Sequence, residues 1–172
     1  MSSARNCRAG GYFRQGPRSF VCRVGGAALA VALMVGSAAA FENATRSERT
    51  ALHVRQLQSD LMVAALSCDM RTRYNRIVKK LQPQLVQHGQ ALTGLFQRTY
   101  GAKAERELNR FVTAMANEAS SRSLSQGAAY CRNSAALFRQ LESMDGASVG
   151  AFSARRYKGA LPSKSQVEEA SR

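Results

Sequence analysis

Apolar residues recur at helical spacing from residue 46 to residue 145, and no strand-like alternation interrupts them. This pattern predicts an all-α fold. Amphipathic helices of this number and size form a four-helix bundle, in which each apolar face turns towards the others. The helices are expected at about 46–66, 70–101, 102–123 and 128–144.

The first helix is expected to begin at a capping box. Thr45 can cap the helix, while Glu48 reaches back to the backbone of Thr45. The apolar stripe of this helix and the next stripe, which starts at Met70, lie on nearly opposite faces. One straight helix cannot bury both stripes, so we expect a break at 67–69, with Asp69 as the N-cap of the second helix.

A proline falls inside the predicted second helix. Pro83 lies on its polar face, and the apolar stripe resumes in phase from Leu85 to Thr99. We therefore expect one helix that is kinked at Pro83 and ends at Gly101. The alternative is that Pro83 opens a new helix, where its missing N–H would have no helical partner in any case.

The third and fourth helices have well-defined apolar faces and end at segments that contain serine or glycine. Residues 146–172 are mostly small, polar or basic, and we expect none of them to join a core. They are interpreted as a disordered basic C-terminal tail. The expected faces are Leu108, Phe111, Val112, Met115 and Ala119 in the third helix, and Tyr130, Ser134, Leu137, Phe138 and Leu141 in the fourth.

The start of the chain is typical of a secretory signal peptide. Five arginines and no acidic residue precede an apolar run from Val24 to Val35, which is too short to span a bilayer. Ala38 and Ala40 suit a cleavage site, so the mature chain is expected to begin at Phe41; a retained anchor is the alternative. The expected organisation is a leader at 1–40, a helical bundle at 41–145 and a tail at 146–172.

Removal of the leader on export would lower both the net charge of the chain and its number of cysteines. The full chain carries 25 Lys and Arg against 11 Asp and Glu, a net charge of +14. Without residues 1–40, which hold five of the arginines, 20 basic side chains face 11 acidic ones. Two cysteines remain, Cys68 and Cys131, and they most simply form one disulfide in an oxidising compartment. We therefore expect a periplasmic or secreted protein.

Sequence motifs for catalysis, metal binding and cofactor binding are missing. The chain has no C-x-x-C pair, no C-x-x-C-H haem site, no G-x-S-x-G elbow and no H-x-x-x-H pair. We therefore expect no enzyme and no cofactor or metal. His88 falls in an apolar stripe, where we expect a buried ring bonded to a backbone carbonyl or a tyrosine. An enzyme or cofactor carrier that uses His88 is the alternative.

Two surface clusters are candidate binding sites. A basic ridge follows the polar face of the predicted second helix and could contact an anionic surface. A polar patch, aligned at i, i+4 and i+7, lies opposite the apolar face of the third helix. Solvation of an ordinary helix face is the alternative for both. The basic ridge consists of Arg73, Arg76, Lys79 and Lys80, and the polar patch of Thr113, Asn117 and Ser120.

Two segments, Cys68–Asn75 and Val112–Ser120, carry a resemblance to known proteins. They resemble a group of small exported helical proteins from alphaproteobacteria. The resemblance spans about residues 57–141. It implies export and a helical fold, and it assigns neither a function nor a site residue.

These features lead to the hypothesis of a non-enzymatic exported protein with a binding or accessory role at the bacterial envelope. Its expected partner is an anionic envelope component or an acidic protein. Export argues against nucleic acid as the partner, although the charge alone would permit it. The alternative function is that of an exported inhibitor or immunity-type protein that neutralises a partner.

Overall fold

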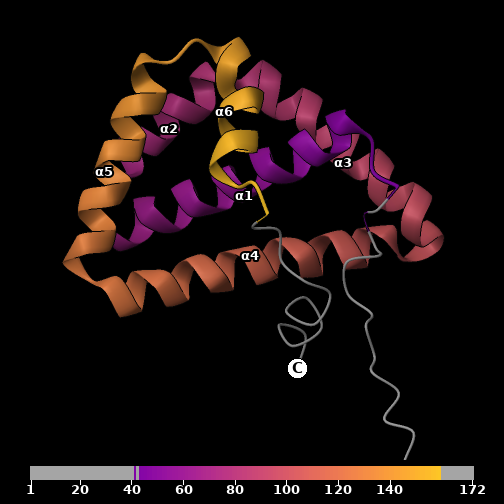
Figure 1. Ribbon diagram of the computed structural model, residues 1–172. Coiled ribbons are helices and arrows are strands. Elements are labelled where there is room, and N and C mark those ends of the chain that lie inside the picture. The colour runs from indigo at the N-terminus through magenta and orange to yellow at the C-terminus, as the bar shows by residue number, and fades with distance from the viewer. Residues whose placement is uncertain (1–40, 42, 160–172) are drawn as a thin grey trace, which may run out of the picture. The chain divides into compact units, whose positions relative to one another are not determined.

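The computed structural model describes residue 41 and residues 43–159, and over these residues the fold is all-helical, as predicted (Figure 1). The four predicted helices become six, because the second predicted range holds two helices and another follows the fourth. The α-helices are α1 (Arg46–Ser67), α2 (Arg71–Lys80), α3 (Gln82–Tyr100), α4 (Ala104–Gln126), α5 (Ala128–Ser143) and α6 (Val149–Arg156), with 3-10 turns η2 (Gly101–Lys103) and η3 (Gly146–Ser148).

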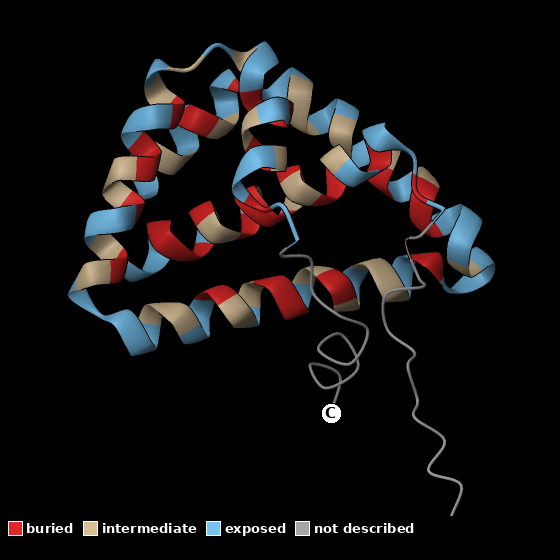
Figure 2. Cartoon of the chain, viewed as in Figure 1, coloured by how far each residue is buried: buried red, intermediate tan, exposed pale blue. Residues whose placement is uncertain are grey.

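Helix α1 lies among the other α-helices and contacts each of them (Figure 1). Its N-terminal half packs on α3 and α4, where Leu52, Phe96 and Phe111 are fully buried. Its C-terminal half packs on α2, α5 and α6, with Leu57 and Phe138 in the centre. Burying one such side chain contributes roughly 1.5–3 kcal/mol. Because several faces of α1 are buried (Figure 2), it is a central helix and not one member of a four-helix bundle.

The predicted capping box is confirmed at the start of α1. Thr45 Oγ1 accepts a hydrogen bond from the N–H of Glu48 at 3.2 Å, and the N–H of Thr45 donates to Glu48 Oε2 at 2.8 Å. Arg98 Nη2 donates to the other carboxylate oxygen at 2.7 Å. The backbone bond from Thr45 and then the bond from Arg98 lower the pKa of Glu48, since both favour its charged form. One carboxylate thus joins the start of α1 to the end of α3.

The predicted break between the first two helices is confirmed, but the role predicted for Asp69 is wrong. Asp69 has a left-handed backbone with φ 53°, and the N–H of Met70 donates to the carbonyl of Ala65 at 2.9 Å. These are the features of a Schellman motif, which ends a helix. An aspartate tolerates the left-handed region better than most residues. Asp69 is therefore the left-handed residue that follows the C-cap of α1, and the N-cap residue of α2 is Met70.

The segment expected to be one helix kinked at Pro83 is two helices that meet at Leu81. Leu81 is the C-cap of α2 and the N-cap of α3, with φ −94° and ψ 5°. Pro83 lies in the first turn of α3, where the backbone N–H groups have no partner within the helix. The arrangement observed is therefore the alternative, in which the proline opens a new helix.

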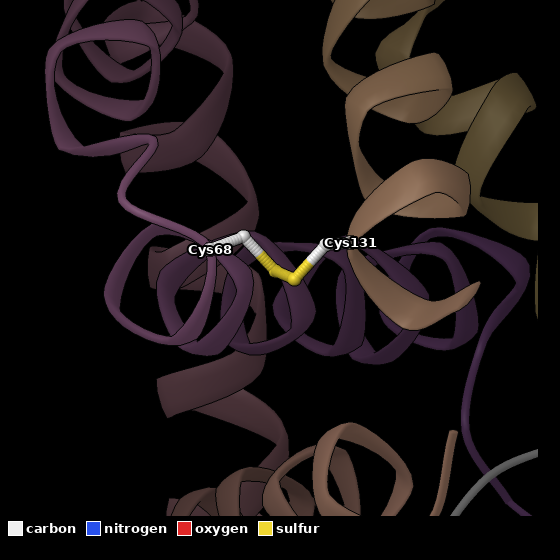
Figure 3. The surroundings of a disulfide bond; sticks show 2 residues. All are labelled: Cys68 and Cys131. Carbon is white, nitrogen blue, oxygen red and sulfur yellow. A yellow bond between two sulfur atoms is a disulfide. The ribbon is translucent and has the colours of Figure 1, made fainter. Parts of the chain in front are cut away.

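The predicted disulfide between Cys68 and Cys131 is confirmed (Figure 3). Cys68 is the C-cap of α1, and Cys131 lies near the start of α5. Their Cα atoms are 5.5 Å apart, although the residues are 63 positions apart in the sequence. The bond ties the turn between α1 and α2 to α5, and both cysteines pack against the core around the C-terminal half of α1.

The predicted disordered tail is wrong for residues 146–159, which form η3, α6 and the turn that follows α6. Val149 and Ser153 are fully buried, and Tyr157 is 7% exposed. The segment has few large apolar residues, and an isolated helix of this length is not stable in water. Packing on α1 supplies the stability that local propensity lacks, and the helical domain extends beyond the expected boundary at 145.

Helix α6 approaches its neighbours closely at a glycine. A Cβ atom on Gly150 would lie 3.1 Å from Thr50 Cγ2 and 3.2 Å from His88 Nε2. Both distances are shorter than an ordinary van der Waals contact. The missing side chain at Gly150 therefore lets α6 pack against α1 and α3 together.

The predicted signal peptide at 1–40 and the last part of the predicted tail, residues 160–172, lie outside the described residues. Phe41, the first residue of the expected mature chain, packs on Phe96 and Phe111, with ring centroids 5.6 Å and 5.8 Å away. Such aromatic pairs stabilise a core beyond their buried area. Among the helices described, none is both long enough and apolar enough to cross a membrane.

Candidate functional site

An open groove of about 480 Å³ lies between α1, α3 and α4, with α2 at one edge. Leu92 and Leu108 on its wall belong to the core of the N-terminal half of α1, while Leu85 belongs to the core of the C-terminal half. The groove therefore lies where the two cores adjoin. Its volume is within the range of about 300–1,000 Å³ that is common for small-molecule sites.

The lining of the groove is mainly aliphatic, with one charged side chain. Arg55 is that side chain, and no aspartate or glutamate contributes to the wall among the described residues. Arg55 Nη1 donates to Gln58 Oε1 at 2.8 Å, while its Nε is buried without a hydrogen-bond partner. The other polar lining residues are neutral: Gln58, Gln82, His88, Thr93 and Asn109.

Burial acts on the guanidinium of Arg55. It lowers the pKa of Arg55 because removal from water disfavours the charged form, and the nearby Tyr74 opposes this effect. Arginine nevertheless keeps its charge at any physiological pH. The groove thus holds a permanent, partly desolvated positive charge beside an aliphatic surface.

The expected bonding of His88 is not observed. His88 is half-buried and lines the groove, but its ring has no hydrogen bond to a described residue and packs against Gly150 instead. His53 Nδ1 is buried without a hydrogen-bond partner among the described residues. Within the described part of the chain, no three His, Cys, Asp or Glu side chains gather in a way that could hold a metal ion.

The pKa values of the two histidines allow a prediction of how the free energy of unfolding depends on pH. Burial lowers the pKa of both His53 and His88 below the ordinary value of 6.5. Below pH 6.5 the unfolded chain therefore binds more protons than the folded chain, and stability falls as the pH falls towards the folded-state pKa values. The slope is at most about 1.4 kcal/mol per pH unit for each histidine.

Urea unfolding between about pH 7.5 and pH 5.5 measures this dependence. The variant with both His53→Gln and His88→Gln is expected to have a flatter profile than the parent over this interval. Glu48 and Glu142 do not interfere, because their lowered pKa values place their effect at more acidic pH. Parallel profiles for the parent and the double variant would contradict the assignment.

In the structure, two of the four residues of the predicted basic ridge are bonded to α5 and the other two are not. Arg73 donates to both carboxylate oxygens of Glu142, at 2.9 Å and 2.6 Å, and this bond lowers the pKa of Glu142. Lys80 Nζ donates to the backbone carbonyl of Glu142 at 2.7 Å, at the C-terminal end of α5 where a cation is favoured. Arg73 and Lys80 therefore attach α2 to α5. Only Arg76 and Lys79 of the ridge are exposed without a bond to a described residue.

The predicted polar patch is exposed on α4, and its hydroxyl groups are already bonded within the helix. Thr113 Oγ1 donates to the carbonyl of Asn109 at 2.9 Å, and Ser120 Oγ donates to that of Ala116, also at 2.9 Å. Asn117 is exposed between them. Hydrogen bonds from a serine or threonine hydroxyl to the backbone carbonyl four residues earlier are common in helices. The structure thus favours the solvated-face interpretation of the polar patch.

Sequence reasoning did not identify the groove or Arg55. The groove needs side chains from residues 51 to 112, on helices whose relative placement the sequence does not reveal. One local signal was present: no acidic residue stands three or four positions from Arg55, whereas Glu118 stands four positions before Arg122. On a helix surface these are the positions from which a carboxylate could pair with an arginine.

No protein-family model matches this chain, and neither a curated protein nor a solved structure matches it.

Proposed function

We propose that the chain is a non-enzymatic exported protein that binds a small ligand at the bacterial envelope, with the groove as its binding site. The observation that carries this proposal is the lining of the groove, which combines an aliphatic wall with one charged side chain, Arg55, and several neutral polar side chains. Pockets of this composition bind and orient small molecules. The leader pattern and the disulfide support export, since disulfides are typical of oxidising compartments.

Blocking the groove tests this proposal. Gly89 lines the groove, and a Cβ atom there would meet no other atom within 4 Å. Gly89→Leu should therefore fill the mouth of the groove without a clash, while leucine in place of glycine favours the helix by about 1 kcal/mol. We expect the neutral fluorophore N-phenyl-1-naphthylamine to bind the parent with increased emission, and to bind Gly89→Leu at least tenfold more weakly.

The matched control is another glycine of α3. Gly94 also has open space at its Cβ position but does not line the groove, so Gly94→Leu should bind the fluorophore like the parent. Equal binding by the parent and both variants would place the site elsewhere. No binding to the parent would contradict a ligand-binding groove.

A second candidate function rests on the exposed cations. Arg76 lies near Glu142 together with Arg139 of α5, and Lys79 is exposed on the same helix as Arg76. These cations could contact an anionic envelope component, or an acidic protein in the case of an inhibitor or immunity-type role. This candidate requires salt-sensitive binding to anionic vesicles that the double change Arg76→Gln and Lys79→Gln abolishes and Gly89→Leu leaves intact.

A further inference from the structure

Arg55 differs from the other partly buried arginines of the described chain. Arg73, Arg110 and Arg122 are half-buried as well, and each pairs with a carboxylate at 2.6 Å, 3.1 Å and 2.7 Å respectively. The partners are Glu142, Glu107 and Asp60. Arg55 has no such pair among the described residues, and its one bond is to the neutral amide of Gln58. The fold thus compensates three of these four charges and leaves the one in the groove uncompensated.

An uncompensated charge of this kind is costly. Burial removes water from the guanidinium, and the buried Nε of Arg55 finds no acceptor in the protein. A donor left in this state loses the hydrogen bond that water would have given it. An incoming anion would restore the missing acceptor and the missing negative charge together, since a carboxylate can bind a guanidinium through two parallel hydrogen bonds.

The groove wall beyond Arg55 indicates what the non-acidic part of such a ligand would be. Val54 precedes Arg55 on α1, and Val78 of α2, Leu85 of α3 and Val112 of α4 continue the aliphatic wall. These side chains offer a surface for a hydrocarbon chain. Beyond Arg55 the lining holds no second formal charge, and its other polar residues are Gln58, Gln82, His88, Thr93 and Asn109. Burial of such a hydrocarbon chain is favourable because each methylene group removes apolar surface from water. The lining therefore suits a molecule with one acidic end and one apolar end.

We propose that the groove binds a monomeric anionic amphiphile of the fatty-acid class, whose carboxylate pairs with Arg55 and whose hydrocarbon chain lies along Val54, Val78 and Leu85. This inference rests on the proposed function, because it assigns a ligand class to the same groove. It requires that the acidic group, and not the hydrocarbon chain alone, determines affinity.

Isothermal titration calorimetry with decanoate and with decanol separates the two contributions, because the ligands share a hydrocarbon chain and differ in the acidic group. We expect the parent protein to bind decanoate at least tenfold more tightly than decanol, as a charge-assisted hydrogen bond implies. Arg55→Met, which keeps an unbranched apolar stem and removes the charged guanidinium, should reduce decanoate affinity to that of decanol. Arg49→Met is the matched control, since Arg49 is exposed on the same helix and does not line the groove.

Thermal unfolding of Arg55→Met tests whether Arg55 has a merely structural role. Removal of an uncompensated, partly buried charge should leave the melting temperature of the ligand-free protein unchanged or higher. A lower melting temperature in Arg55→Met would show that the arginine serves the fold, and would overturn the proposal.

The binding results distinguish failure of the inference from failure of the proposed function. Equal affinities for decanoate and decanol, both lost in Gly89→Leu, would overturn the acidic ligand class and leave the groove as a binding site. Absence of binding by decanoate, decanol and the neutral fluorophore would overturn both. Binding to anionic vesicles without binding to monomeric decanoate would also overturn the inference, because it would assign Arg55 to a membrane surface.

Discussion

Replacement of Cys68 by serine is expected to lower the free energy of unfolding by about 2–5 kcal/mol. Cys68 and Cys131 are 63 positions apart, so their bond restricts a long loop in the unfolded chain. The chain-entropy estimate for such a loop is roughly 4 kcal/mol. The loss should be large for a domain of this size, because the total stability of small domains is only about 5–15 kcal/mol.

Urea unfolding with and without a thiol reductant provides the measurement and its control. The reductant should destabilise the parent by a similar amount and should leave Cys68→Ser unaffected. Titration of the denatured, unreduced mature protein should find no free thiol. Two free thiols in that titration, or a parent that is insensitive to reductant, would contradict the prediction.

The second large effect is expected at Asp60, which joins three helices. Asp60 Oδ1 accepts from Arg122 Nη2 of α4 at 2.7 Å and from Gln56 Nε2 at 3.2 Å, and Asp60 Oδ2 accepts from Tyr157 Oη at 2.8 Å. The carboxylate is 13% exposed and the arginine 33%. Burial, reinforced by the charge of Asp60, raises the pKa of Tyr157 well above its ordinary value, so the phenol remains a donor.

Asp60→Asn is therefore expected to destabilise the protein by about 2–4 kcal/mol, because it leaves Arg122 without its buried partner and presents an amide N–H group to donors. The matched control is Glu118→Gln, which removes a more exposed carboxylate that also pairs with Arg122. Its expected cost is below about 1 kcal/mol. Urea unfolding measures both values.

Hydrogen exchange adds a local measurement of the same change. The amides of α6 should lose protection in Asp60→Asn, because Tyr157 is the hydrogen-bonded link between this end of the chain and α1. Glu118→Gln should leave the protection of α6 unchanged. Equal destabilisation by both substitutions would mean that Asp60 is not the junction of the three helices.

The features that could be predicted from the sequence are those whose interacting residues lie close together in the sequence. Thr45 and Glu48 are three positions apart, and their reciprocal bonds form the expected cap. The apolar face predicted for the fourth helix is buried at every position in α5. The break before Met70 followed from a change of phase over a few residues. In each case the signal lies within one or two helical turns, where the periodicity of the chain determines which side chains are neighbours.

The predictions that failed depended on competition between local and distant interactions. Pro83 was compatible with a kink or with a new helix, and both fit the same apolar stripe. The segment that forms α6 has weak local propensity, and its burial on α1 could not be inferred from small residues such as Gly150. Arg73 was expected to face solvent because it lies on the polar face of its helix, opposite the apolar stripe, yet Glu142 pairs with it from 69 positions away.

By itself, the sequence determined the helical class of the described chain, the start of α1, the turn that follows it and the pairing of Cys68 with Cys131. Only the tertiary structure decided that α6 belongs to the domain and that the groove leaves Arg55 without a carboxylate. The physical reason is distance along the chain: Tyr157 bonds to Asp60 across 97 positions, and Arg122 bonds to the same carboxylate across 62. Helical periodicity specifies which face of a helix is buried, but which charge on another helix meets that face depends on how the helices pack.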